Sequence, residues 1–172
     1  MKFIDSSRDP WRALEPAQLA AQAAAPTHAL LALKDWLDLD PAGRQGLARS
    51  ARIGLLVPND FEVEALAPEL PGLALLALQF PKWTDGRAYT QARLLRLRHR
   101  YAGELRATGQ VLVDMLLPLA RSGFDAAQLR EDQDPLAARR ALEFFPGHYQ
   151  ADARQPLQRP AGLAWAALGV AA

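Results

Sequence analysis

The sequence predicts one α/β domain with four or five mostly parallel strands that alternate with helices. Short, continuous apolar runs recur along the chain and are bounded by Pro, Gly, Asn or Asp, which is typical of buried strands. Helical periodicity fills the segments between these runs, and such alternation builds a parallel sheet covered by helices. We expect an open sheet rather than half of a barrel, because an open sheet suits a chain of 172 residues better.

The N-terminal third carries the weakest signals. Residues 1–27 are rich in Ala and broken by three prolines, which predicts a loosely ordered arm. Residues 29–33 predict a short strand, and residues 34–39 predict a helical turn. Residues 40–51 contain one proline and two glycines, and we expect a connection there.

From residue 52 onward the pattern becomes regular. Four strands are expected, at residues 53–57, 73–80, 104–108 and 124–129. Four helices are expected, at residues 61–66, 88–100, 110–121 and 135–144. The α/β domain therefore spans residues 28–150, and residues 151–172 form a C-terminal tail rich in Pro, Ala and Gly.

Composition excludes several classes of protein. A net charge of +1 argues against nucleic-acid binding through bulk electrostatics. The chain contains no cysteine, which excludes a disulfide framework, a thiolate nucleophile and a cysteine-ligated iron–sulfur cluster. Charged residues interrupt the N-terminus early, and no apolar stretch approaches the ~20 residues that span a bilayer. We therefore expect a cytoplasmic protein with neither a membrane nor a nucleic acid as its partner.

Motifs for metals and cofactors are missing from the sequence. His28, His99 and His148 lack the spacing of metal ligands, so we expect no metal site. The glycine fingerprint of dinucleotide binding, the phosphate-binding lysine loop and the hydrolase nucleophile elbow are also absent. We therefore expect no intrinsic cofactor.

A dense polar segment follows the apolar run at residues 73–80, and it is the strongest candidate for a binding site. Lys82 and Arg87 supply positive charge, Trp83 lies between them, and Asp85 precedes a glycine that allows a tight turn. Loops after parallel strands meet at one edge of the sheet, where α/β proteins usually bind ligands. This pattern predicts an anion-binding loop at residues 81–87. In the alternative interpretation, Asp85 only caps the next helix and both cations are solvated.

Two further segments carry charge in patterns that need an explanation. Glu104, Arg106 and Thr108 alternate, so they should point to one side of their strand, either at a sheet edge or towards the binding site. We favour the site, because the strand leads directly to the ligand edge. The helix at residues 88–100 carries arginines on one face, which is either a docking face for an acidic partner or a solvated surface.

The residues of this region resemble a bacterial family of unknown function, the domain-of-unknown-function 934 family. The resemblance runs through FPKWTDGRAYTQARLLR at residues 80–96, GELRATG at residues 103–109 and GFD at residues 123–125. Members are described as probable oxidoreductases involved in sulfite reduction. Two family positions differ here, because Gln110 and Val113 stand where an Asp and an Arg are usual.

Together, the residue chemistry and the resemblance define the candidate site. The expected ligand-binding residues are Lys82, Trp83, Arg87, Gln91, Arg93, Arg106, Thr108 and Gly109. The candidates for proton transfer are Asp85, Tyr89 and Glu104.

The resemblance implies an accessory protein of assimilatory sulfite or sulfate reduction, with sulfite reductase or adenylyl-sulfate reductase as its partner. The absence of cysteine fits a helper better than a self-contained reductase. One alternative is an enzyme or sensor of sulfur metabolism that binds a small anion or a nucleotide phosphate. A second alternative is a purely structural interaction protein.

Overall fold

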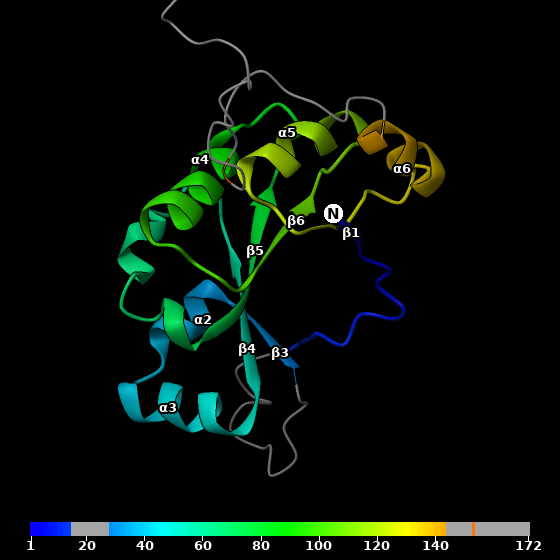
Figure 1. Cartoon of the computed structure of the whole chain (residues 1–172). Coiled ribbons are helices and arrows are strands. Elements are labelled where there is room, and N and C mark those ends of the chain that lie inside the picture. The colour runs from blue at the N-terminus through cyan, green and yellow to red at the C-terminus, as the bar shows by residue number, and fades with distance from the viewer. Residues whose placement is uncertain (15–27, 144–152, 154–172) are drawn as a thin grey trace, which may run out of the picture.

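Figure 1 shows the computed structural model, which describes residues 1–14, 28–143 and 153. All strand pairs are parallel and form one seven-stranded sheet in the order β1-β7-β6-β5-β4-β3-β2. The strands are β1 (Lys2–Phe3), β2 (Arg12–Ala13), β3 (His28–Ala32), β4 (Arg52–Val57), β5 (Leu73–Phe80), β6 (Glu104–Gly109) and β7 (Ala126–Ala127). The α-helices are α2 (Leu33–Asp38), α3 (Pro41–Ser50), α4 (Arg87–Arg93), α5 (Leu116–Ser122) and α6 (Pro135–Glu143). Shorter turns are η1 (Val63–Leu66), η2 (Leu70–Gly72), the π-helical η3 (Leu94–Arg98) and η4 (Val113–Met115).

The α/β class with a parallel sheet is confirmed, but the expected strand number and the open sheet are wrong. Seven strands form a curled half-barrel. Strands β2 to β7 neighbour one another in sequence order, and right-handed crossovers then place the described connecting helices on the same face. The sheet curls away from that face, as in half of a (βα) barrel. The additional strands β1 and β2 contain only two residues each, too few to produce an apolar run.

The connection expected at residues 40–51 is instead the helix α3. Its start is well specified, because the Asp40 side chain accepts a hydrogen bond from the Gly43 amide at 2.8 Å and Pro41 occupies the first turn. None of its residues is buried, so no apolar stripe marks it in the sequence. The helix is docked through Arg44, whose guanidinium forms an ion pair with Glu69 at 2.7 Å.

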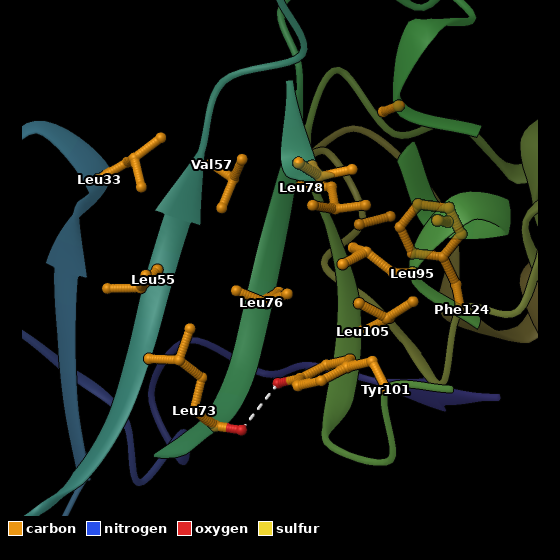
Figure 2. Packing of buried hydrophobic residues seen from close by; sticks show 14 of the residues in the cluster. Leu33, Leu55, Val57, Leu73, Leu76, Leu78, Leu95, Tyr101, Leu105 and Phe124 are labelled. Atoms are coloured by element: carbon orange, nitrogen blue, oxygen red, sulfur yellow. Dashed lines mark hydrogen bonds between the residues drawn. The ribbon is translucent and has the colours of Figure 1, made fainter. Parts of the chain in front are cut away.

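The convex face of the sheet packs against helices and contains the main core. Figure 2 shows Leu78 of β5 and Leu105 of β6 beside Leu95 of η3 and Phe124, which lies between α5 and β7. Each fully buried Leu contributes about 1.5–3 kcal/mol. The Tyr101 hydroxyl is a polar group within this layer, and it donates a hydrogen bond to the Leu73 carbonyl at 3.1 Å. Burial raises the pKa of Tyr101, so its hydroxyl stays protonated and able to donate.

The concave face is covered differently. Residues 4–11, here called the strap, run from β1 at one sheet edge to β2 at the other edge. In Figure 1 this blue segment lies on the opposite side of the sheet from α2, α3 and α4. Trp11 of the strap is buried directly over Gly54, where an added Cβ would lie 2.8 Å from its ring. Gly54 therefore forms the notch that receives the strap.

Candidate functional site

The loop between β5 and α4, residues 81–87, is organised around one ion pair. The Arg87 guanidinium donates two hydrogen bonds to the Asp85 carboxylate, from Nη2 to Oδ2 at 2.7 Å and from Nε to Oδ1 at 3.1 Å. The Asp85 carboxylate also accepts from the Arg87 amide at 3.2 Å, and the Asp85 amide closes a turn onto the Lys82 carbonyl. These hydrogen bonds from Arg87 hold the pKa of Asp85 well below its usual range. Asp85 is therefore ionised, and Arg87 already binds its carboxylate oxygens. Both conditions make it a poor proton acceptor.

Two further side chains of the loop, those of Lys82 and Trp83, face solvent. Trp83 is 58% exposed, although a large aromatic side chain is normally buried. Lys82 is exposed and forms no ion pair with a side chain in the part of the chain that the structure describes. The loop therefore presents an unpaired cation beside an exposed aromatic ring, both held on a turn fixed by Asp85 and Arg87.

Gln91 lies behind this loop and connects it to the loop after β4. Its side-chain amide donates to the carbonyls of Pro58 and Phe61, each at 2.8 Å. The Gln91 Oε1 and the Asn59 Nδ2 are buried without a well-formed hydrogen bond to the described residues. Gln91 thus ties α4 to the loop after β4, and only its remaining oxygen could serve a ligand.

Tyr89 and Arg93 occupy different environments on the same helix. The Tyr89 ring packs edge-on against Phe80 at 5.2 Å and against Phe124 at 6.5 Å between centroids. Partial burial raises the pKa of Tyr89, so its hydroxyl is neutral at physiological pH. Arg93 is exposed.

The end of β6 approaches the loop through its backbone. Gly109 has a φ of 90°, and an added Cβ would lie 2.5 Å from the Phe80 carbonyl oxygen. That carbonyl accepts the Gln110 amide at 2.8 Å, which joins the ends of β5 and β6. Thr108 is buried, and its hydroxyl lies 3.4 Å from the Leu78 carbonyl. These two residues therefore shape the edge of the sheet.

Glu104 and Arg106 share one side of β6, as the alternation indicated, but they meet partners outside the 81–87 loop. Arg106 binds Glu104 and also Asp9 of the strap. Lys2 lies 3.8 Å from the second carboxylate oxygen of Glu104. The structure therefore separates the expected site into an exposed loop and a charged cluster on the concave face. Sequence reasoning missed Asp9 and Lys2, because nothing in the local pattern of the N-terminal segment links them to β6.

Sequence reasoning also missed the role of Arg96. Its guanidinium donates to the Gly123 and Gly103 carbonyls, each at 2.9 Å, and forms an ion pair with Asp125. Arg96 therefore links η3 to the segments that lead into β6 and β7, which is a structural role. On the basic helix, the choice between a docking face and a solvated face concerns Arg93 and Arg100, which are exposed.

The described residues also limit what chemistry can be assigned. No three His, Asp or Glu side chains among them lie together as metal ligands would. In the same ranges, every helix is too short or too polar to cross a membrane.

Comparison with known proteins gives one clear match. No curated protein matches the chain significantly. A family model described as a bacterial protein of unknown function, DUF934, matches residues 54–159. The match covers β5, the 81–87 loop, α4 and β6, so the loop and both members of the Glu104–Arg106 pair lie inside it. Because more than half of the sequence is matched, this chain belongs to the DUF934 family.

Proposed function

We propose that this protein is an accessory component of assimilatory sulfite or sulfate reduction that acts with sulfite reductase. The proposed contact element is the loop at residues 81–87, which would bind a small anion or an anionic patch of the partner. The pathway follows from the family resemblance described above. The exposed pair of Lys82 and Trp83 carries the structural argument, since both side chains stand at the ligand edge of the sheet.

The pairing of the proton-transfer candidates supports a binding role rather than turnover. Asp85 is engaged by Arg87, and Glu104 is engaged by Arg106. Tyr89 has a raised pKa and packs in an aromatic cluster. A general base needs an accessible lone pair near the operating pH, and none of these three groups offers one in this arrangement.

The loop has the parts of a small interaction site. Tryptophan is enriched among the residues that contribute most to binding, because its ring buries a large area when a partner covers it. Lys82 adds a positive charge that would steer an acidic partner or hold an anion. The bidentate pair of Asp85 and Arg87 keeps the loop in one conformation, which lowers the entropy lost on binding.

The pathway is tested by deletion of the gene. The deletion strain should grow poorly on sulfate or sulfite as its only sulfur source and normally on cysteine. Normal growth on all three sources would refute the assignment to sulfite reduction.

The contact element is tested by complementation and co-purification. A Lys82→Ala/Trp83→Ala variant should fold normally, because both side chains are exposed, and should lose most of its co-purification with the sulfite reductase hemoprotein. The matched control is Lys34→Ala/Leu136→Ala, which removes an exposed lysine and an exposed apolar side chain from α2 and α6. Equal co-purification of both variants with the reductase would exclude the loop as the contact.

A second candidate is an enzyme or sensor that binds a small anion in the same loop. This candidate is favoured by the bidentate hydrogen bonding of Arg87 to a carboxylate, because arginine binds oxyanions with the same geometry. Calorimetry with sulfite, sulfate and a nucleotide should then give binding that Arg87→Ala removes. Absence of heat with all three would exclude this candidate without affecting the test of partner binding.

A further inference from the structure

A cavity of about 340 Å³ lies between the strap and the concave face of the sheet. Its walls come from β1 and the strap on one side and from β6 on the other. The charged lining residues are Lys2, Asp5, Arg8, Asp9, Glu104 and Arg106. The interior side of a parallel sheet is usually apolar, so this concentration of charge is unusual for its position.

Arg106 is the centre of this cluster. Only 4% of its side chain is exposed, and its guanidinium is held along two edges. Glu104, two residues earlier on the same strand, accepts from Nε at 3.0 Å and from Nη2 at 2.8 Å. Asp9 of the strap faces the other edge, with Nη1 bonded to Oδ2 and Nη2 lying 3.4 Å from Oδ1. Paired contact of this kind is how arginine recognises carboxylates and oxyanions.

The sheet provides space for this arrangement. Arg106 pairs in register with Ala77 on β5 and with Ala126 on β7. Both neighbours carry only a methyl group, so the guanidinium rests over a floor of small side chains. The hydrogen bonds between Arg106 and Glu104 are therefore fixed by the strand that carries both residues. The hydrogen bonds between Arg106 and Asp9 depend on the position of the strap.

The strap itself is attached mainly at its ends. β1 holds the beginning, and the ring of Trp11 holds the end over Gly54. Between them most hydrogen bonds are local, as in the turn where the Ser7 amide and hydroxyl both donate to Asp5. The described side-chain hydrogen bonds that reach this middle part from outside the strap are those of Arg106 with the Asp9 carboxylate, of Arg12 with the Asp9 carbonyl at 2.9 Å and of Gln128 with Ser6. A segment with so few ties can open locally without unfolding the domain.

We propose that this cavity is a binding site for a small oxyanion or carboxylate, which takes the place of Asp9 on Arg106. The Asp9 carboxylate is then an internal competitor that holds the strap closed while the site is empty. Once the strap has opened, Lys2 and Arg106 face Glu104 alone. One anion would neutralise that excess positive charge. The site uses none of residues 81–87 and stands independently of the function proposed above.

The decisive variant is Asp9→Asn, which keeps the size of the side chain and removes the competing charge. Its affinity for an anion should rise about tenfold or more, because the anion no longer displaces a charge-assisted hydrogen bond. Asp5→Asn is the matched control, since Asp5 carries the same charge in the same strap and bonds locally rather than to Arg106. Its effect on affinity should be several times smaller.

Calorimetry on the full chain at low salt supplies the measurement, with sulfate, sulfite and acetate as separate probes. Binding of sulfate or sulfite alone assigns an oxyanion, and binding of acetate alone assigns a carboxylate. Amide hydrogen exchange in residues 4–9 should increase on binding, because the strap opens, while exchange in β5 stays unchanged.

Two variants keep the proposal falsifiable. Asp9→Asn/Arg106→Lys retains the positive charge but lacks the two-edged guanidinium, and it should lose the gained affinity. Lys82→Ala should leave binding intact, whereas loss of binding in this variant would place the anion in the 81–87 loop instead. If no probe binds Asp9→Asn at millimolar concentration, or if Arg106→Lys changes nothing in that background, Asp9 and Arg106 form only a static clamp.

Discussion

The two faces of the sheet are shielded from water by different means. Leu76 and Leu75 are adjacent on β5, and both are fully buried. Leu76 belongs to the cluster under the helices, whereas Leu75 lies beside Gly54 on the face that the strap covers. The convex face excludes water with a continuous apolar layer, and the concave face does so with one tryptophan and a charged cluster.

This difference separates stability from binding capacity. A close-packed apolar layer stabilises the fold but offers a ligand no polar group to recognise. The concave face has buried charges and a thin cover, so it can exchange one partner of Arg106 for another at moderate cost. The contrast leads to four expected outcomes, in order of decreasing effect.

The largest effect is expected from a matched pair of leucine truncations. Leu76→Ala should cost about 3–5 kcal/mol of unfolding free energy, because the rigid helices around it cannot close the cavity. Leu75→Ala should cost about 2 kcal/mol, because the strap can settle into the space. Denaturant titration of both variants measures the difference. Equal losses would mean that the strap is as rigid as the helical layer.

Gly54→Ala should disturb only the concave face. The new Cβ would lie 2.8 Å from the Trp11 ring, so the strap must lift, at a cost of about 1–3 kcal/mol. Proteolysis of the N-terminal segment should become faster in this variant. Gly46→Ala in α3 is the control, since no atom lies within 4 Å of its added Cβ, and it should be neutral or slightly stabilising. Unchanged proteolysis of Gly54→Ala would show that Trp11 does not anchor the strap.

Tyr101→Phe removes a buried polar contact of the convex face. The Leu73 carbonyl would lose its hydrogen bond from the hydroxyl, and we expect a loss of about 1 kcal/mol in thermal or denaturant unfolding. The apolar packing of the ring is preserved, so the effect should stay well below that of Leu76→Ala. A loss as large as that of Leu76→Ala would mean that this single hydrogen bond orders the whole end of β5.

The smallest effect belongs to the exposed edge of the sheet. Arg130 donates two hydrogen bonds of 2.6 Å to Asp132 and lowers the pKa of that carboxyl from 3.8 to about 2. Because the folded pKa is depressed, the stabilisation is present above pH 3.8 and is lost as the pH falls through 2. Carboxyl titration by NMR should show this value, and Arg130→Gln should return it towards 3.8. A pKa unchanged in Arg130→Gln would assign the shift to another group.

The sequence predicted those parts of the molecule whose signals are local. The long apolar run of β5 and the shared side of Glu104 and Arg106 both follow from neighbouring residues, and the structure shows both. The pair was expected to face the 81–87 loop, but its described partners lie in the N-terminal segment. By contrast, β1 and β2 form only because distant strands offer them free edges, so their two residues carry no pattern. The Asp9 partner of Arg106 could not be predicted for the same reason.

One feature of the topology also bears on how the chain is assembled. Residues 2–13 cap both edges of the sheet, so Lys2 must wait for Ala126 before β1 can pair. Contacts between such distant positions are slow to form, which makes edge closure a late event in folding. Until then β7 exposes unpaired backbone groups that can template association with another copy. By pairing with β7, the N-terminal residues cover backbone groups that could otherwise pair with another copy of the chain.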